Sequence, residues 1–401
     1  NKNKFQANGG VGIIASRLLL EGPIKQGTGS FLLGGRATYA HLLLPLFDVD
    51  NVAYFYDLNT KISYKLNPKN NIYLSGYFGR DVFNISDSFE NTYGNTVVNF
   101  RWNHLFSDQL FSNLSLIYSD YYYGLNLNFV GFEWNSGIQN MNIKYDFKHY
   151  INDRYKLEYG VHSTYYRFNP GVISPNSPDS GINREALTNK FAFENAFYID
   201  INQQLTERLA LNYGVRLSSF LRLGQDELNV YENDKAVGYN SDLQLYEKID
   251  PIGTESSSQG KVTKSFLNVE PRLALSYQLN DDTALKASYN RMTQYLHLLS
   301  NTSSPAPLDV WTPSGKFIKP QILDQIAVGY FKNYDSYSLE VESFYKVIKN
   351  RIDYIDGANL IANNAIEQVI LNGRSRAYGL ELLFRKNKGR FKGWFAYTLS
   401  K

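Results

Sequence analysis

Bulky and polar side chains alternate along much of this chain. From residue 52 to residue 66 every second side chain is apolar, aromatic or β-branched, and polar residues such as Asp57 and Lys61 lie between them. Successive side chains of a β-strand point to opposite faces, so a period of two is typical of a strand. Asn67 and Pro68 then reverse the chain, and residues 72–79 alternate in the same way. The segment predicts a β-hairpin.

This hairpin pattern repeats and predicts sixteen strands, without a helical pattern of convincing length between them. The first predicted strand ends near residue 20, and the others cover residues 30–41, 52–66, 72–79, 96–102, 110–124, 141–147, 155–166, 190–202, 208–220, 269–279, 283–291, 325–331, 337–346, 376–384 and 391–401. Long polar links are expected at residues 84–94, 169–186, 221–264, 294–321 and 350–373.

Short polar turns and longer links alternate along the predicted strands, which favours a transmembrane antiparallel β-barrel with short periplasmic turns and long extracellular loops. A soluble β-sandwich would show the same hairpins without this sidedness. Several apolar faces approach the ~9–11 residues with which a strand crosses a bilayer. Aromatic residues also recur near the short turns, as in an interfacial girdle: Tyr64, Phe106, Phe147, Tyr155, Tyr277, Phe331, Tyr337, Phe384 and Phe391.

The composition is compatible with this all-β fold class. The 401 residues include no cysteine, and the formal net charge of +3 is too small to indicate nucleic-acid binding. The longest apolar run, residues 42–47, is far shorter than the ~20 residues of a membrane helix. The mean hydropathy of −0.37 would suit a soluble protein, but a transmembrane barrel is also polar on one strand face.

No pattern in the chain points to catalysis. The five histidines lack metal-ligand spacing, and no nucleophile elbow, P-loop or dinucleotide motif is present. Glu340 and Glu342 fall on one face of a predicted strand, where a charged wall is favoured over an acid–base pair. The sequence therefore predicts a protein that is not an enzyme and that carries neither a metal nor a cofactor.

Two sets of residues are candidates for contact with a solute. The presumed lumen face carries both signs of charge, which suits a water-filled or plugged interior rather than an ion-selective pore: Arg101, Lys144, Glu158, Arg216, Arg272, Lys286, Glu340 and Glu381. Aromatic and histidine side chains at strand ends or in loops could stack on a ligand or could anchor the loops: Tyr121, Tyr122, Tyr123, His297, Trp311 and Tyr354.

Several segments resemble, in order and spacing, the barrel of a TonB-dependent receptor, the plugged outer-membrane transporter of 22 strands. They are residues 9–24, 29–43, 212–220, 289–333 and 375–401, so that the resemblance covers nearly the whole chain, residues 1–401. It is strongest to the branch whose precursors carry a carboxypeptidase-regulatory-like domain before the plug. We expect the plug, the TonB box and the closing strands to lie outside this sequence, because the unpaired edges of about sixteen strands could not stand in a bilayer.

The resemblance implies an active importer of the bacterial cell outer membrane. A scarce solute would bind between the loops and the plug, and the TonB–ExbB–ExbD complex would then open a path. The implied surroundings and partners are outer-membrane lipid and lipopolysaccharide, a small solute, glycan or peptide ligand, and a surface lipoprotein or a larger envelope assembly. The alternatives are a structural barrel within an envelope complex and a passive porin.

Overall fold

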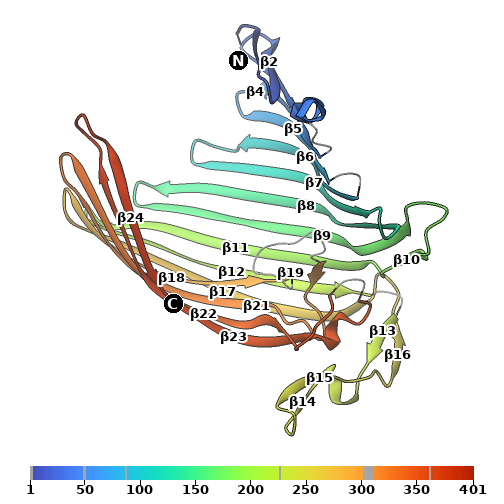
Figure 1. Cartoon of the computed structure of the whole chain (residues 1–401). Helices are drawn as coiled ribbons and strands as arrows, with labels where there is room; N and C mark the ends of the chain where they lie inside the picture. The colour runs from blue at the N-terminus through green and yellow to red at the C-terminus, as the bar shows by residue number, and fades with distance from the viewer. Residues whose placement is uncertain (1–2, 48–50, 86–87, 225–226, 301–309, 361–362) are drawn as a thin grey trace.

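The computed structural model describes residues 3–47, 51–85, 88–224, 227–300, 310–360 and 363–401. Its main feature is one curved antiparallel sheet of 18 strands, in which neighbours along the chain are neighbours in the sheet (Figure 1). Strands β1 and β24 lie at the two edges of this wall, and each pairs with one neighbour among the described residues. The fold is the transmembrane antiparallel β-barrel that the alternating pattern predicts.

The strands of the wall are longer than the sequence pattern suggests. They are β1 (Gln6–Val11), β2 (Ala15–Lys25), β3 (Gly29–Thr38), β4 (Val52–Asn67), β5 (Asn70–Ile85), β6 (Phe89–Leu105), β7 (Leu110–Leu127), β8 (Phe132–Asn152), β9 (Tyr155–Pro175), the two-residue β10 (Glu185–Ala186), β11 (Lys190–Thr206), β12 (Leu209–Leu223), β17 (Val262–Asn280), β18 (Thr283–Gln294), β21 (Gln321–Asn333), β22 (Tyr337–Tyr354), β23 (Ile370–Lys386) and β24 (Gly393–Ser400).

Two expectations about strand boundaries were wrong. The first predicted strand is two, because a turn at Gly12 separates β1 from β2. The link expected at residues 84–94 is largely strand, since β5 and β6 continue through most of it, and half of the link expected at residues 169–186 is strand, since β9 extends to Pro175 and β10 lies at its end. With 21 residues, β8 and β9 are about twice as long as a bilayer crossing requires, so these strands project beyond the membrane on the loop side.

The remaining elements lie in the connections between wall strands, and β13 to β16 are at the lower right in Figure 1. They are the 3₁₀ turns η1 (Ala40–Leu42), η2 (Leu44–Phe47), η3 (Glu232–Asp234) and η4 (Ile366–Gln368), and the short strands β13 (Glu227–Val230), β14 (Val237–Asn240), β15 (Leu245–Lys248), β16 (Gly253–Ser256), β19 (Leu296–Leu299) and β20 (Val310–Pro313). β13 pairs with β16, β14 with β15, and β19 with β20. Within the described part of the chain, no helix is long and apolar enough to span a membrane.

One face of the wall is apolar and open to its surroundings. Large apolar side chains that alternate with polar ones remain exposed on strand after strand: Leu58, Leu74, Val98, Leu116, Ile143, Val161, Phe197, Leu217, Leu273, Val328 and Leu380. A soluble sandwich would bury this face in a core, whereas a barrel presents it to lipid. We call it the outer face, and the opposite one the inner face.

One residue predicted to belong to the aromatic girdle near the short turns lies on the other face of the wall. Phe147 stacks on Phe106 and Tyr159, and Tyr337 stacks on Phe384, as expected of an interfacial row. Phe331, however, pairs across the strands with Glu340 and therefore lies on the inner face. There the ammonium group of Lys286 lies 4.5 Å above the Phe331 ring, an interaction that alternation alone did not reveal.

Candidate functional site

Strand register places the predicted wall residues on one face. Direct cross-strand partners point to the same face of a sheet. Because Arg101 pairs with Ser115, Ser115 with Lys144, and Lys144 with His162, these residues of β6 to β9 all lie on one face. The same succession continues to β23 and puts the whole predicted lumen set on the inner face: Arg101, Lys144, Glu158, Arg216, Arg272, Lys286, Glu340 and Glu381.

The inner face carries a chain of charges across β8, β9, β11 and β12. Asp146 accepts hydrogen bonds from Tyr198 (2.7 Å) and from Nε2 of His162 (3.0 Å). Nδ1 of His162 lies 3.2 Å from the Arg216 guanidinium, which can only donate, so Nδ1 accepts and the ring carries its proton on Nε2. Arg216 also lies 3.7 Å from Glu194. Opposite charges thus neutralise one another on the inner face, so this part of the wall is neither uniformly positive nor uniformly negative.

The β19–β20 hairpin packs against the inner face of the wall. Phe168 and Phe220, on β9 and β12, are fully buried beneath it. Tyr295, just before β19, stacks on Phe220 with the rings nearly parallel and their centroids 4.8 Å apart. Trp311 on β20 packs against the same cluster. A loop on the extracellular side therefore folds back into the mouth of the barrel.

Hydrogen bonds hold this hairpin to the wall. The Tyr295 hydroxyl accepts from Nδ2 of Asn268 (2.8 Å) and lies 2.8 Å from Oγ of Ser218. Ser218 Oγ also lies 2.5 Å from Oε1 of Glu270, to which it donates. Ser218 and Glu270 are buried from bulk solvent, so these hydrogen bonds satisfy polar groups that would otherwise lack partners. No sequence pattern marks Tyr295, since it follows a strand whose alternation has ended.

The three adjacent tyrosines of β7 are divided between the two faces. Tyr121 and Tyr123 point inward, and Tyr123 is buried with Trp134 and with Val310 of the hairpin. Tyr122 points outward, lies under the Arg80 guanidinium at 5.1 Å, and donates to Oδ1 of Asn135. The three side chains therefore do not form one stacking surface.

The other candidate ligand residues surround the inward hairpin. His297 is 1 % exposed, and its Nε2 lies 2.8 Å from Oγ of Ser314. Burial disfavours the imidazolium and lowers the pKa of His297 to about 4. Trp311 is half-buried, and the Tyr354 hydroxyl accepts a hydrogen bond from the backbone of Ser300. The mouth thus gathers five of the six candidates, all except Tyr122, while their contact with a ligand stays a prediction.

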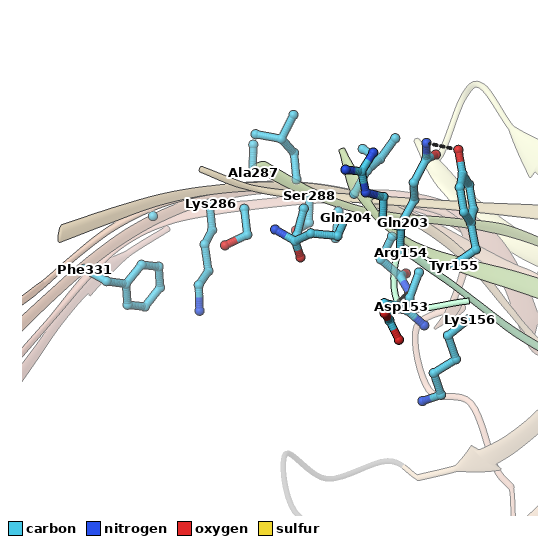
Figure 2. Close-up of a pocket in the computed structure, with 18 of the residues that line it drawn as sticks. Asp153, Arg154, Tyr155, Lys156, Gln203, Gln204, Lys286, Ala287, Ser288 and Phe331 are labelled. Atoms are coloured by element: carbon cyan, nitrogen blue, oxygen red, sulfur yellow. Dashed lines mark hydrogen bonds between the residues drawn. The ribbon is translucent and has the colours of Figure 1, made fainter. Parts of the chain in front are cut away.

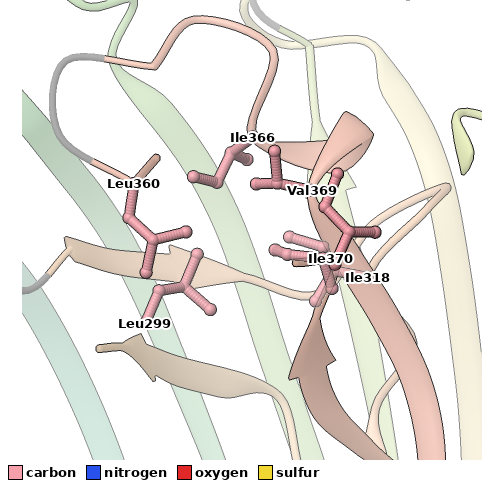
Figure 3. Close-up of a cluster of buried hydrophobic side chains, with 7 residues drawn as sticks. Leu299, Ile318, Leu360, Ile366, Val369 and Ile370 are labelled. Carbon is pink, nitrogen blue, oxygen red and sulfur yellow. The ribbon is translucent and has the colours of Figure 1, made fainter. Parts of the chain in front are cut away.

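Neighbouring loops interlock above the hairpin. Figure 3 shows the apolar cluster in which Leu299 of β19 and Ile318 meet the β22–β23 loop, represented by Leu360 and Ile366. Oε1 of Glu367, from η4, accepts hydrogen bonds from Asn229 (2.9 Å) and from Tyr231 (2.8 Å) of the β12–β17 loop. These contacts tie three extracellular connections into one body.

An open trough lies on the inner face at the periplasmic end of the wall (Figure 2). Its volume is ≈ 830 Å³, and its floor carries short side chains such as Ala274, Ser288 and Ala327. Lys156 and Lys286 extend into it from either side. Because the side chains on the trough floor are short, a polar surface has room to lie against the wall here. Among the described residues, no group of three or more His, Asp or Glu side chains is placed to hold a metal.

Residues 34–401 match the family model described as TonB dependent receptor-like, beta-barrel. The chain belongs to this family. Membership confirms the predicted receptor family and its place in the bacterial outer membrane, and the family is one of receptors rather than enzymes. No curated relative matches the sequence.

Solved structures share the fold of this receptor barrel at low sequence identity. The alcaligin receptor FauA of Bordetella pertussis is 12 % identical with a TM-score of 0.62, over 99 % of this chain and 60 % of that one. The hemophore receptor HasR of Serratia marcescens, solved with HasA and heme, is 12 % identical with a TM-score of 0.66, over 99 % and 62 %. The ferric-catecholate import receptor Fiu of E. coli K12 is 12 % identical with a TM-score of 0.64, over 100 % and 65 %. The chain therefore spans about three fifths of the length of these receptors.

Proposed function

We propose that this chain is the barrel wall of an active importer, which captures a scarce solute at the cell surface and draws energy from the TonB–ExbB–ExbD complex. The inward hairpin supports this proposal most directly. Tyr295 and Phe220 hold this loop against the inner wall, so its side chains line the mouth of the barrel, where a specific solute could be bound rather than pass freely. A solute would then bind above the hairpin, against the inward tyrosines of β7 and Trp311.

Residues 1–401 would form the barrel domain of a larger receptor, in the branch with an N-terminal carboxypeptidase-regulatory-like domain. Its plug would lie against the trough, where the wall offers short side chains and hydrogen-bonding groups such as Asn202, Asn212 and Ser276. Lys286 and Glu342 supply both signs of charge for a polar partner. The ligand would be a small solute, a glycan or a peptide, and a larger one would need a surface lipoprotein above the loops.

The test begins with the intact receptor, purified from the outer membrane in order to identify the molecule that co-purifies by native mass spectrometry. A radiolabelled form is then offered to cells with and without ExbB–ExbD. We expect accumulation to fall to background without the complex, while surface binding persists. Uptake that is independent of the complex would indicate a porin, and neither binding nor uptake would indicate a structural barrel.

Neighbouring residues on opposite faces provide a matched test of the binding surface. Tyr121→Ala removes an inward ring, and Tyr122→Ala removes the adjacent outward one. Stacking on an aromatic ring contributes roughly 1 kcal/mol, so we expect about fivefold weaker ligand binding for Tyr121→Ala alone. Equal losses in the two variants would contradict a ligand site on the inner face.

A further inference from the structure

The outer face of β22 and β23 divides into bands along the membrane normal. Tyr337 stacks on Phe384 at a centroid distance of 5.4 Å near the periplasmic turn, and Tyr345 stacks on Tyr378 at 6.3 Å toward the loops. Between these pairs the outward positions are mostly apolar: Leu339, Val341, Leu380 and Leu382. Eight residues of strand cover about 26 Å along the strand, and a strand tilt of ~40° reduces this to about 20 Å along the membrane normal, most of the ~25 Å height of a lipid-facing band. The two aromatic pairs therefore mark the two interfaces.

Cations follow directly above the upper aromatic pair. Lys349 and Arg374 are cross-strand partners, and Arg376 lies two residues from Arg374 on the same face. We call Lys349, Arg374 and Arg376 the basic cluster. All three are exposed, and among the described residues no carboxylate lies within 4 Å of any of them. On β18, two strands from β22, Arg291 is neutralised by Asp324 of β21 through two hydrogen bonds of 2.7 and 3.1 Å.

The basic cluster is a local feature of the wall. Toward the loop ends of β5 to β9, outward arginines such as Arg80 and Arg167 alternate with the carboxylates of Glu90, Asp120 and Glu133. Like charges directly opposite each other on neighbouring strands destabilise a sheet. Asp324 attracts Lys349 but is already bound by Arg291, so it only partly offsets the repulsion between Lys349 and Arg374. An anion bound between Lys349 and Arg374 would offset the rest.

We infer that the basic cluster binds the phosphate groups of lipid A, the membrane anchor of lipopolysaccharide in the outer leaflet. The Tyr345–Tyr378 pair sets the depth, with the acyl chains against the apolar band and the phosphates at the cations. The arginine guanidinium groups match phosphate oxygens in pairs, which favours phosphate over a general anionic surface. The inference rests on the outer-membrane location and not on the proposed transport.

The full-length receptor in phosphatidylcholine nanodiscs provides the test, with bisphosphorylated lipid A titrated at low salt. Each cation near an anionic headgroup contributes roughly a fivefold factor to affinity, so K349Q/R374Q/R376Q should bind on the order of 100-fold more weakly. R376Q alone should lose about fivefold. The matched control is R154Q/R208Q/R390Q, which removes three exposed cations from periplasmic turns and should leave binding unchanged.

Comparing phosphorylated lipid A, dephosphorylated lipid A and inorganic phosphate shows whether the cluster recognises the phosphate of a lipid or free phosphate. Dephosphorylated lipid A should bind the native receptor about as weakly as bisphosphorylated lipid A binds the triple variant. K349R should retain the affinity, whereas R374K/R376K should lose part of it, because an ammonium group cannot match phosphate oxygens in pairs. Inorganic phosphate should not compete at concentrations near that of lipid A, since it lacks the acyl contacts. Equal binding of phosphorylated and dephosphorylated lipid A, or an equal loss in the periplasmic control, would overturn the inference.

Discussion

The hydroxyl of Tyr295 joins the inward hairpin to the barrel wall. It meets Ser218 and Asn268, which lie on different strands, while its ring covers Phe220. A buried polar group that loses its partner costs more than an exposed one, because water cannot replace the lost bond. The closed position of the hairpin should therefore depend on this one oxygen more than on any exposed contact of the loops.

Removing that oxygen should loosen the hairpin. Tyr295→Phe leaves the buried Ser218 and the neighbouring Asn268 short of a partner, at a cost of about 1–3 kcal/mol. We expect amide exchange in Leu296–Leu299 to accelerate about tenfold or more in the full-length receptor. Tyr239→Phe, in the exposed β14–β15 hairpin, is the control. Unchanged protection in Tyr295→Phe would show that the ring alone holds the hairpin.

His297 makes the hairpin sensitive to pH. Its pKa is lowered from 6.5 to about 4 by burial, so between these values the opened hairpin binds more protons than the closed one. The stability of the closed hairpin is complete above pH 6.5 and declines as the pH falls toward 4, by at most about 3 kcal/mol. At pH 5.5 we expect about tenfold more opening than at pH 7.5, measured by exchange of Leu296–Leu299 after correction for the intrinsic rate. His297→Gln should abolish this difference, and a persistent pH dependence would assign it to another group.

At the scale of elements, Glu367 connects two loops that are distant in the sequence. It accepts from Asn229 and Tyr231, which lie 138 and 136 residues away. Burial, and then proximity to this carboxylate, raise the pKa of the Tyr231 hydroxyl, which therefore stays a proton donor. We expect Glu367→Ala to raise amide exchange in β13 and in η4 together, by roughly tenfold. Glu232→Ala, in the same loop, should change neither. Faster exchange in one loop alone would mean that the loops are held separately.

Strand ends were less predictable than strand centres. On β8 the outward residues Met141 and Ile143 are apolar, but Gln139, Asn135 and Glu133 beyond them are polar. A strand that leaves the bilayer meets water on its outer face, so the alternation that identifies it disappears while the backbone pairing continues. This explains why the chain beyond Asn169 was expected to be a loop and is part of β9.

At the scale of the whole molecule, alternation carries most of the information about the wall and little about the mouth. The alternation of side chains along each strand was enough to place Arg101, Glu158 and Glu381 on the same face of an 18-stranded sheet. The inward hairpin depends on contacts between segments far apart in the chain, such as Ser218 with Tyr295, which no local period encodes. The error at Phe331 has another origin, since alternation with Val328 and Tyr330 already places it inward and only its position near a short turn suggested the girdle.

The account depends most on the claim that alternate side chains of each strand meet lipid and water. Residues 1–401 contain no cysteine, so an introduced cysteine is the one spin-labelling site within this part of the receptor. We would label positions 140–145 of β8 in turn, in the full-length receptor within native outer membranes, and measure collision rates with oxygen and with a water-soluble nickel complex. Oxygen contact should be highest at Met141, Ile143 and Tyr145, and nickel contact highest at Asn140, Asn142 and Lys144. A profile without period two, or with the two sets exchanged, would contradict the barrel orientation described here.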